Sequence, residues 1–458
     1  MQYLWPETNN EESEETNAEQ EKIIVFLTIP YYLEKLISFG FIVCLDCFIF
    51  YFTLFPIRFV LSTLYICTKY IFGIQKKSSY YIHLFDTMRG LVLIISCLML
   101  YYIDTSVVYH NLRGQSIIKS YVIFNMLEVI EKLMTSLGQD IYKAVFRFCV
   151  RFGKNEFENQ NFLLFSIFYV LLFASFSIFH GFLILCQAVT LNIAMNSHNM
   201  ALLTIMISNQ FVELKGNVFR KFEEANLFQL ACSDIRERLH VFIFLIIIIV
   251  RNLDQFAWNL DYFLDILPGV LLIFFSEWFL DWIKHAFIVK FNSIQSNFYQ
   301  KCSLILTADL GASPTIITDH SLSLCKRMGL LCIPLQCVVC KIILESGTIL
   351  QQSKSVIFLS IASAFVLKFI LGYAVVRACR YKPLPRPRLR RNSNLSQLSS
   401  DSITSEEERS SYLIQDFPED VQHSLRNRHP GATVKSNKSK KRALEEVGRF
   451  TLCSNAIV

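Results

Sequence analysis

Hydrophobic residues form long runs that short polar stretches separate along most of the chain. Several of these runs reach the about 20 residues that a helix needs to cross a bilayer. The apolar runs cover residues 39–56, 57–74, 88–109, 161–187, 240–250, 263–288, 328–344 and 356–376. Because lipid cannot satisfy backbone hydrogen bonds, spanning segments of this length are expected to be helices. The pattern predicts an all-α, polytopic helical membrane protein with six to eight spans and additional amphipathic helices.

One amphipathic helix, or two in succession, is expected over residues 116–152. Apolar residues recur there at helical spacing, at Ile118, Val122, Met126, Val129 and Leu133. A helix of this kind packs on the bundle or lies at the membrane interface. Gly138 is expected to end it, since glycine commonly follows the last turn of a helix.

Two further boundaries follow from local sequence signals. Asp234 and Glu237 have capping-box spacing, which predicts a helix that starts near Ile235. Residues 292–326 are polar and contain Gly311 and Pro314, so this connection is expected to be a loop.

The segment from Gln187 to His240 is the least lipid-like part of the hydrophobic body. Lipid would leave its side-chain amides without hydrogen-bond partners, so they need protein or water. We treat it as a candidate docking and polar module, with the candidate residues Asn192, Asn196, His198, Asn199, Asn209, Glu213 and Lys215.

Four ionisable residues inside apolar runs are candidate intramembrane polar residues: Asp46, Glu277, Asp281 and His285. The last three share one helix face at i, i+4 and i+8, where they could bind a divalent metal or relay protons. The alternative is a charged stripe that packs against Lys or Arg of a neighbouring helix, with Lys284 and Lys290 as local partners. We favour the stripe, because one helix face cannot complete a zinc shell.

Asp46 would be costly in contact with lipid and must therefore face protein or water. We expect it to form an intramembrane ion pair, with Lys341 or Lys368 as the candidate partner. A role of Asp46 in transport is the alternative interpretation.

The two ends of the chain differ from its hydrophobic body. Residues 1–22 are acidic and polar, and we expect a disordered arm there. Residues 23–381 form the predicted helical transmembrane domain. Residues 382–458 are rich in Ser and Arg and are expected to be a disordered tail, which dense Arg beside the last span places in the cytosol. Ser393 follows Arg391 and Ser405 precedes Glu406, so cytosolic kinases are candidate partners at both serines.

Composition supports the membrane class, since the chain is 53% hydrophobic and only 18% charged. Its fourteen Cys lie mostly within apolar runs, which argues against a disulfide framework. We find no nucleophile elbow, Walker A loop, zinc-protease motif or dinucleotide fingerprint. The sequence therefore gives no support for an enzyme, for a cofactor or metal, or for a nucleic-acid partner.

Four motifs resemble the transmembrane anterior posterior transformation protein family. They are QAVTLNIAMNSHNMALLTIMISNQFVELKGNVFRKFEEANLFQLACSDIRERLH from Gln187, RGQSIIKSYVIFNMLEVIEKLMTSLGQD from Arg113, RNLDQFAWN from Arg251 and SEWFLDWIKHAFIVKFNSI from Ser276. They occur in family order, and the resemblance as a whole runs over residues 29–381. The acidic arm and the tail carry no part of this resemblance.

The resemblance implies a multi-pass membrane protein of the endoplasmic reticulum. Fungal family members associate with a SUN-like-domain membrane protein and support the stability of lumenal proteins. Animal members are tied to primary cilium formation, which includes association with the ciliary basal body, and to developmental patterning. It brings no catalytic residues.

The sequence leaves two functional hypotheses. The first is a non-enzymatic scaffold or adapter of the endoplasmic reticulum membrane, whose partners are the lipid bilayer and a SUN-like-domain membrane protein. The alternative is a channel or transporter that uses the intramembrane acidic residues.

Overall fold

A computed structural model describes residues 10–72, 80–153, 162–196, 201–222, 224–256, 258–292, 294–295, 297–311, 319–346 and 354–381. Every regular element in these ranges is a helix. The chain divides into two units, Met1–Leu384 and Pro385–Val458. All described residues lie in the first unit, and both candidate phosphosites, Ser393 and Ser405, lie outside the described residues.

The helices follow one another with short connections. They are α1 (Asn10–Phe52), α2 (Leu54–Phe72), α3 (Tyr80–Tyr101), α4 (Thr105–Arg113), α5 (Ile117–Gly153), α6 (Phe162–Met195), α7 (Ala201–Val218), α8 (Glu224–Gln255), α9 (Leu260–Asn292), α10 (Phe298–Gly311), α11 (Ser321–Met328), α12 (Cys332–Glu345) and α14 (Lys354–Tyr381).

Five of the described helices are long and apolar enough to cross a membrane. The qualifying segments are Ile23–Phe52, Tyr80–Tyr101, Leu164–Met195, Leu260–Asn292 and Ile361–Cys379. Helices α11 and α12 would add a sixth crossing if they act as one span, although they meet at 110°. These observations confirm an all-α polytopic architecture. Among the described residues the number of spans is five, and it reaches the predicted range of six to eight only if α11 and α12 form one span.

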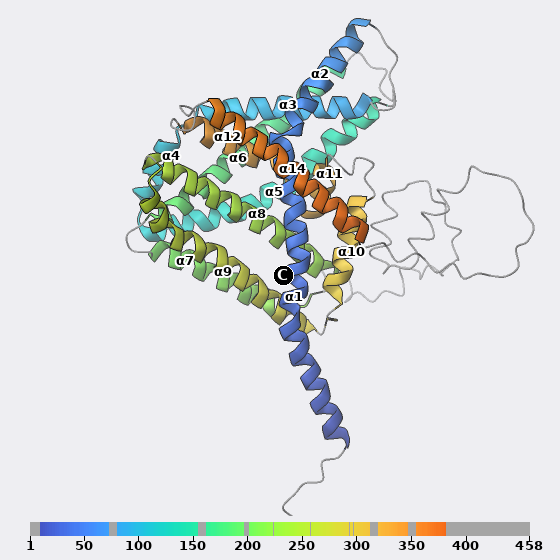
Figure 1. Cartoon of the computed structure of the whole chain (residues 1–458), viewed down its shortest axis with the longest axis vertical. Helices are drawn as coiled ribbons and strands as arrows, with labels where there is room; N and C mark the ends of the chain where they lie inside the picture. The colour runs from blue at the N-terminus through green and yellow to red at the C-terminus, as the bar shows by residue number, and fades with distance from the viewer. Residues whose placement is uncertain are drawn as a thin grey trace, which may run out of the picture. The chain divides into compact units, whose positions relative to one another are not determined.

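Helix α1 runs along the bundle and joins helices from distant parts of the chain (Figure 1). It packs against α8, α9, α10, α12 and α14. A second group is formed by α3, α5 and α6, which pack on one another. Buried apolar side chains of α1, such as Leu33, Leu36 and Val43, form part of the common core. The first helix therefore connects helices from the C-terminal half of the described chain.

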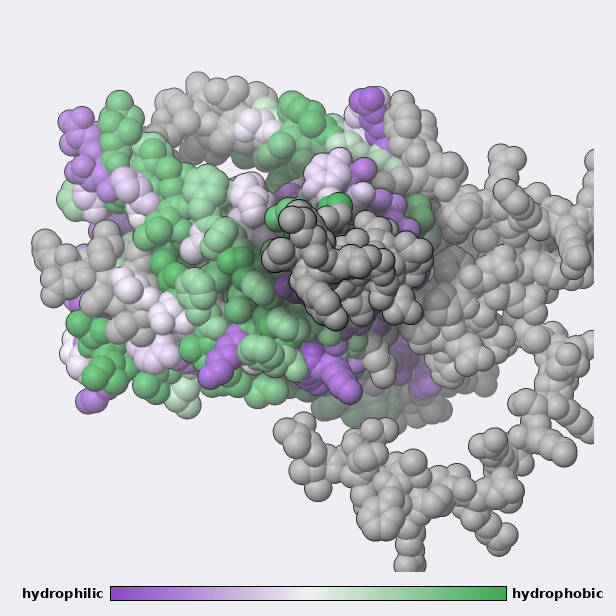
Figure 2. Space-filling view, turned by 90° about the horizontal axis from the view of Figure 1, so that it is seen from below, coloured by the Kyte–Doolittle hydropathy of each residue, from purple (hydrophilic) through white to green (hydrophobic). Residues whose placement is uncertain are grey.

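Apolar side chains also cover much of the outer surface of the described part (Figure 2). On α3, Leu98 and Met99 are exposed, and on α14 Ile361, Val366 and Phe369 are exposed. Exposed apolar side chains on long helices suit a lipid environment rather than water. The surface thus agrees with a multi-pass membrane protein.

Helix α1 begins at Asn10, inside the acidic arm for which the sequence predicted disorder. The segment from Asn10 to Lys22 is rich in Glu, which is a good helix former. Acidic residues near a helix N-terminus are also favoured by the helix dipole. The low hydrophobicity of this segment therefore did not distinguish a polar helix from a disordered arm.

Gly138 does not end a helix, because α5 continues through it to Gly153. A side chain at Gly138 would overlap Leu331 and Phe176, so glycine permits close packing of α5 against its neighbours there. The predicted helix end at this position was wrong, since a packing glycine and a capping glycine are identical in sequence.

Residues 292–326 contain helices α10 and α11, so the predicted loop was also wrong. The buried side chains Cys302, Leu306 and Leu310 recur every four residues along α10. This stripe faces the bundle and packs α10 against α1. The composition of the whole connection, which includes polar residues, Gly311 and Pro314, concealed this short amphipathic helix.

Candidate functional site

The main polar site is a buried cluster of ionised side chains between α8 and α9. Asp234, on α8, accepts hydrogen bonds from Lys284 at 2.8 Å and pairs with His285 at 2.7 Å. Tyr299 of α10 hydrogen-bonds the other ring nitrogen of His285 at 2.8 Å. Burial opposes the charged form, but Lys284 and His285 hold the pKa of Asp234 below its ordinary range.

Asp234 therefore does not cap a helix. Helix α8 begins ten residues earlier, at Glu224, and Asp234 lies within it. The predicted start near Ile235 was wrong, because the carboxylate binds side chains of α9 and not backbone amides of its own first turn.

Arg238, one turn further along α8, extends the cluster to α1. Its Nε donates to Asp281 at 2.8 Å, and its Nη1 donates to both oxygens of Glu34 at 3.0 and 3.2 Å. Trp282 Nε1 donates to Glu34 at 3.0 Å. Lys284 Nζ lies 3.0 Å from Asp281 and connects this part to Asp234. Three helices that are distant in sequence thus share one set of ion pairs.

The members of the acidic stripe predicted on α9 therefore pair with different residues. Asp281 pairs with Arg238 of the neighbouring helix and with Lys284, and His285 pairs with Asp234. Glu277 is half-buried and lines the recesses beside this cluster together with Arg238 and Lys284. The described residues contain no group of three or more His, Cys, Asp or Glu that could hold a metal ion.

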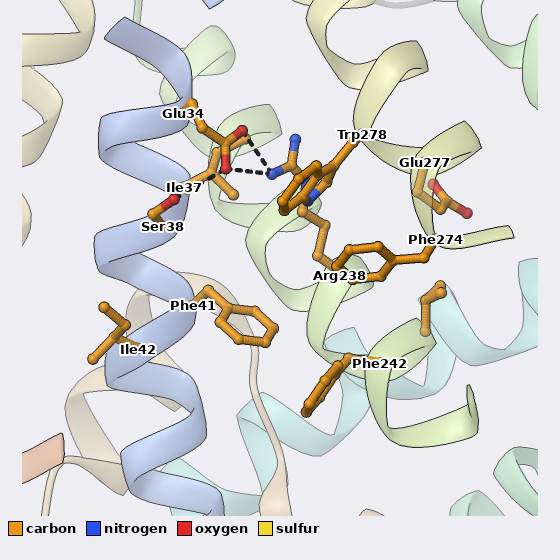
Figure 3. A pocket seen from close by; sticks show the side chains of 11 residues that line it. Glu34, Ile37, Ser38, Phe41, Ile42, Arg238, Phe242, Phe274, Glu277 and Trp278 are labelled. Carbon is orange, nitrogen blue, oxygen red and sulfur yellow. Dashed lines mark hydrogen bonds and ion pairs between the residues drawn. The ribbon is translucent and has the colours of Figure 1, made fainter. Parts of the chain in front are cut away.

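A recess of about 300 Å³ opens beside Arg238, between α1, α8 and α9 (Figure 3). Glu34 and Arg238 form its polar end, and Phe41, Phe242 and Phe274 form apolar walls. Exposed Ser38 lies at its edge. The lining of the recess thus changes from charged to apolar side chains along the helices.

A second recess, of about 160 Å³, lies on the other side of α8. Its polar residues include Glu131, Lys132, Glu237 and Glu277, and the last of these also borders the first recess. Burial raises the pKa of Glu237 to about 7, with Asp234 contributing, although its side chain is 34% exposed in the recess. Burial would also raise the pKa of Glu131, but nearby His240 and Arg236 hold it below its ordinary value.

Asp46 forms an ion pair with Lys368 of α14, with a distance of 2.6 Å between Oδ2 and Nζ. Both side chains are buried, and Lys368 also donates to the Asp46 carbonyl at 3.3 Å. Lys341, the other candidate partner, pairs with Glu345 instead. Asp46 thus fixes α14 to α1.

The predicted polar module is separated into parts. Asn196 donates to Asn192 at 3.1 Å and to Asn252 at 2.9 Å, and Asn252 donates to Asn192 at 2.9 Å. These three residues, the amide cluster, join α6 to α8. Lys215 is exposed on α7.

The other members of the predicted module are not placed in a common site. Asn209 and Glu213 belong to α7, but their side chains lie outside the described part. His198 and Asn199 lie outside the described residues.

A second charged cluster around Arg89 was not found from sequence. Arg89 is fully buried and donates to Asp86, to Asp319 at 3.0 Å, to Ser321 at 2.8 Å and to Tyr142 at 3.1 Å. The i, i+3 spacing of Asp86 and Arg89 at the start of a span was the available signal. Asp319 lies 230 residues away, and no local pattern predicts that contact.

Over its N-terminal half, helix α5 buries polar side chains and exposes apolar ones, so we call this half inverted. Its polar residues Ser120, Glu131 and Thr135 are buried, and Thr135 donates to Glu131 at 2.9 Å. Its opposite side is an exposed apolar stripe, the α5 stripe, formed by Ile118, Val122, Met126, Val129, Leu133 and Leu137. The predicted amphipathic helix exists, but over this half its apolar face is directed away from the bundle.

Comparison with known proteins identifies the family. The profile of a eukaryotic membrane protein family matches residues 80–382. The Transmembrane anterior posterior transformation protein 1 homolog of Homo sapiens is 40% identical over 333 residues, which cover 71% of the chain and 58% of that protein. The Protein TAPT1 homolog of Caenorhabditis elegans is 36% identical over 375 residues, which cover 80% of the chain and 51% of that protein.

A similar Protein TAPT1 homolog occurs in Dictyostelium discoideum, with 37% identity over 83% of the chain and 47% of that protein. The chain thus spans about half the length of these relatives. No solved structure matches. The family match over residues 80–382, together with these relatives, shows that the chain belongs to the eukaryotic membrane protein family that includes the transmembrane anterior posterior transformation proteins.

Proposed function

We propose that the protein is a non-enzymatic scaffold of the endoplasmic reticulum membrane that docks a partner's transmembrane helix on the α5 stripe. The partner is a SUN-like-domain membrane protein, and the complex supports the stability of lumenal proteins. The family resemblance supports this choice of partner and compartment. The relatives' names support a downstream role in developmental patterning, and the resemblance extends that role to cilium formation.

The inverted half of α5 is the observation that carries the proposal. Six exposed apolar side chains follow one face of the helix from Ile118 to Leu137. At 1.5 Å per residue this stripe is about 28 Å long, similar to the thickness of a bilayer core. Helix α5 is not among the described helices apolar enough to span, so its apolar surface is confined to this one stripe. One partner helix would cover a stripe of this length and width.

Tryptophan substitutions separate a docked helix from lipid, because lipid accommodates a larger apolar side chain and a packed helix does not. Met126→Trp and Val129→Trp test the stripe, and Leu98→Trp on α3 is the matched control. All three native side chains are 59% exposed. We expect co-purification of the SUN-like-domain partner in mild detergent to fall roughly fivefold or more for the α5 variants, the effect of about 1 kcal/mol. The control should retain the partner.

Two outcomes would contradict the scaffold. One is retention of the partner by both α5 variants at the level of the control. The other is failure to recover any SUN-like-domain partner with the native chain in crosslinking followed by mass spectrometry.

The two recesses favour a transporter as the second candidate function. Glu277 borders both of them, and the ion pair of Arg238 and Asp281 lies where they approach each other. A pathway between the recesses would need this pair to open. Ion flux in reconstituted liposomes that is lost in Glu277→Gln, and kept in Lys290→Gln at the exposed end of α9, would support transport over a pure scaffold.

A further inference from the structure

We propose that the first recess binds one zwitterionic phospholipid, with its headgroup at Glu34 and Arg238 and the start of an acyl chain against the apolar wall that Phe41 and Phe242 form together. The proposal concerns a ligand site and does not depend on the scaffold function. It rests on the position of the recess, its polarity gradient and the balance of its charges.

The position of the recess places it against lipid. Its walls belong partly to α1 and α9, two of the helices that qualify as membrane spans. Ser38 at the edge is exposed, and Phe41, Phe242 and Phe274 are only half-buried. The recess therefore opens on the bilayer side of these helices, where lipid is the molecule present at the highest concentration.

The polarity gradient matches the two ends of a lipid. Glu34, Arg238 and Trp278 lie at one level, and Phe41, Ile42 and Phe242 lie one to two turns further along their helices (Figure 3). The rings of Phe41 and Phe242 pack edge to face with centroids 5.5 Å apart. The volume of about 300 Å³ equals about ten water molecules, which suits part of one acyl chain but not a whole lipid.

The charges of the recess select the headgroup. Glu34 and Glu277 border it together with a single cation, Arg238, which is already bound to Glu34 and Asp281. An anionic headgroup would meet this surplus of carboxylates and be repelled. A choline or ethanolamine cation would be attracted by these carboxylates.

One hydrogen-bond donor at this end has no acceptor among the described residues. Arg238 uses Nε for Asp281 and Nη1 for Glu34, whereas its Nη2 has no partner there. Its Cζ lies 5.7 Å from the centre of the Trp278 ring. A phosphate or ester oxygen of the bound lipid would supply the acceptor, while the headgroup cation compensates the charge of the phosphate.

Photolabelling tests the site directly. The purified full chain is incubated with a phosphatidylcholine that carries a diazirine near the start of one acyl chain, irradiated, digested and analysed by mass spectrometry. We expect labels to concentrate on the α8 and α9 peptides that contain Phe242 and Phe274. Unlabelled phosphatidylcholine should compete at least about tenfold better than phosphatidylserine, given the cost of like charges.

Ser38→Trp fills the edge of the recess and should lower this labelling roughly fivefold or more, in line with the cost of overpacking a site. Ser175→Trp on α6 is the matched control, because both serines are exposed and each loses one hydrogen bond within its own helix. The control should label as the native chain does.

Three results would overturn the proposal. The first is labelling spread evenly over the exposed spans, which indicates only an annular lipid layer. The second is equal competition by phosphatidylserine. The third is unchanged labelling in Ser38→Trp. If that variant does not fold, label position and competition in the native chain still decide the question.

Discussion

The charged cluster between α8 and α9 and the amide cluster between α6 and α8 both bury polar side chains, but with different consequences. In the first, Asp234, Arg238 and Lys284 each meet an opposite charge. In the second, Asn252 donates a neutral hydrogen bond to Asn192. Loss of one partner leaves a buried charge in the first cluster and only an unpaired dipole in the second. The charged cluster should therefore tolerate single substitutions far less well.

Lys284→Met should have the largest effect, because it leaves both Asp234 and Asp281 without their lysine partner. We expect the free energy of unfolding to fall by about 3–5 kcal/mol, measured by denaturant titration in detergent. Lys290→Met is the control, since Lys290 is exposed near the end of the same helix, and it should change stability little. Equal effects of the two substitutions would remove the distinction between the charged cluster and an ordinary surface charge.

Lys368→Met should be nearly as costly, because Asp46 then keeps a buried charge without a partner. The double variant Asp46→Leu with Lys368→Met removes both charges and should regain most of the lost stability. The thermal midpoints of both variants in detergent measure this. A double variant as unstable as the single one would indicate that the ion pair itself, and not avoidance of a lone charge, stabilises α14 on α1.

Asn252→Leu tests the amide cluster and should cost about 1–3 kcal/mol, the range for leaving buried polar groups unsatisfied. Its side chain is buried and bonds Asn192, Asn196 and the Ile248 carbonyl. Asn217→Leu, at a half-buried position of α7, is the control. If Asn252→Leu cost as much as Lys284→Met in the same titration, the neutral and charged clusters would not differ as proposed.

The pH dependence of stability should show the smallest effect. The pKa of Glu237 is about 7 in the folded protein, against 4.5 ordinarily. Between these values the folded protein holds a proton that the unfolded chain has released, so stability falls as pH rises from about 5 to 7. In Glu237→Gln the thermal midpoint should change less with pH across this window than in the native protein. Glu128→Gln, at the edge of the same recess, is the control and should keep the native pH dependence. If stability still fell with rising pH in Glu237→Gln, another titrating group would be the cause.

The sequence predicted the class of the fold well because membrane spans are local. A run such as 161–187 contains within itself the length and hydrophobicity that make α6 a span. The ion pair of Asp46 with a lysine could also be anticipated, since a charge in an apolar run needs a partner. The choice of Lys368 over Lys341 depended on packing and required the structure.

The candidate site was predicted less well because its contacts are not local. The sequence predicted that Asn192 and Asn196, as amides among apolar residues, need hydrogen-bond partners. Their third partner, Asn252, lies in another helix and could not be identified from sequence. Asp234 has the spacing of a cap, and only its distance to Lys284 identifies it as an ion-pair partner. The outward direction of the α5 stripe was likewise invisible, since periodicity defines a face but not what the face contacts.

The ion pair between Glu34 and Arg238 has a consequence for biosynthesis. The two residues are 204 positions apart. A ribosome adding about 5–20 residues per second needs roughly 10–40 s to make that interval. During this time the first helix has left the ribosome, but Arg238, the ion-pair partner of Glu34, has not yet been synthesised. Nascent chains of this protein therefore pass through a period in which α1 depends on lipid, water or another protein to shelter Glu34.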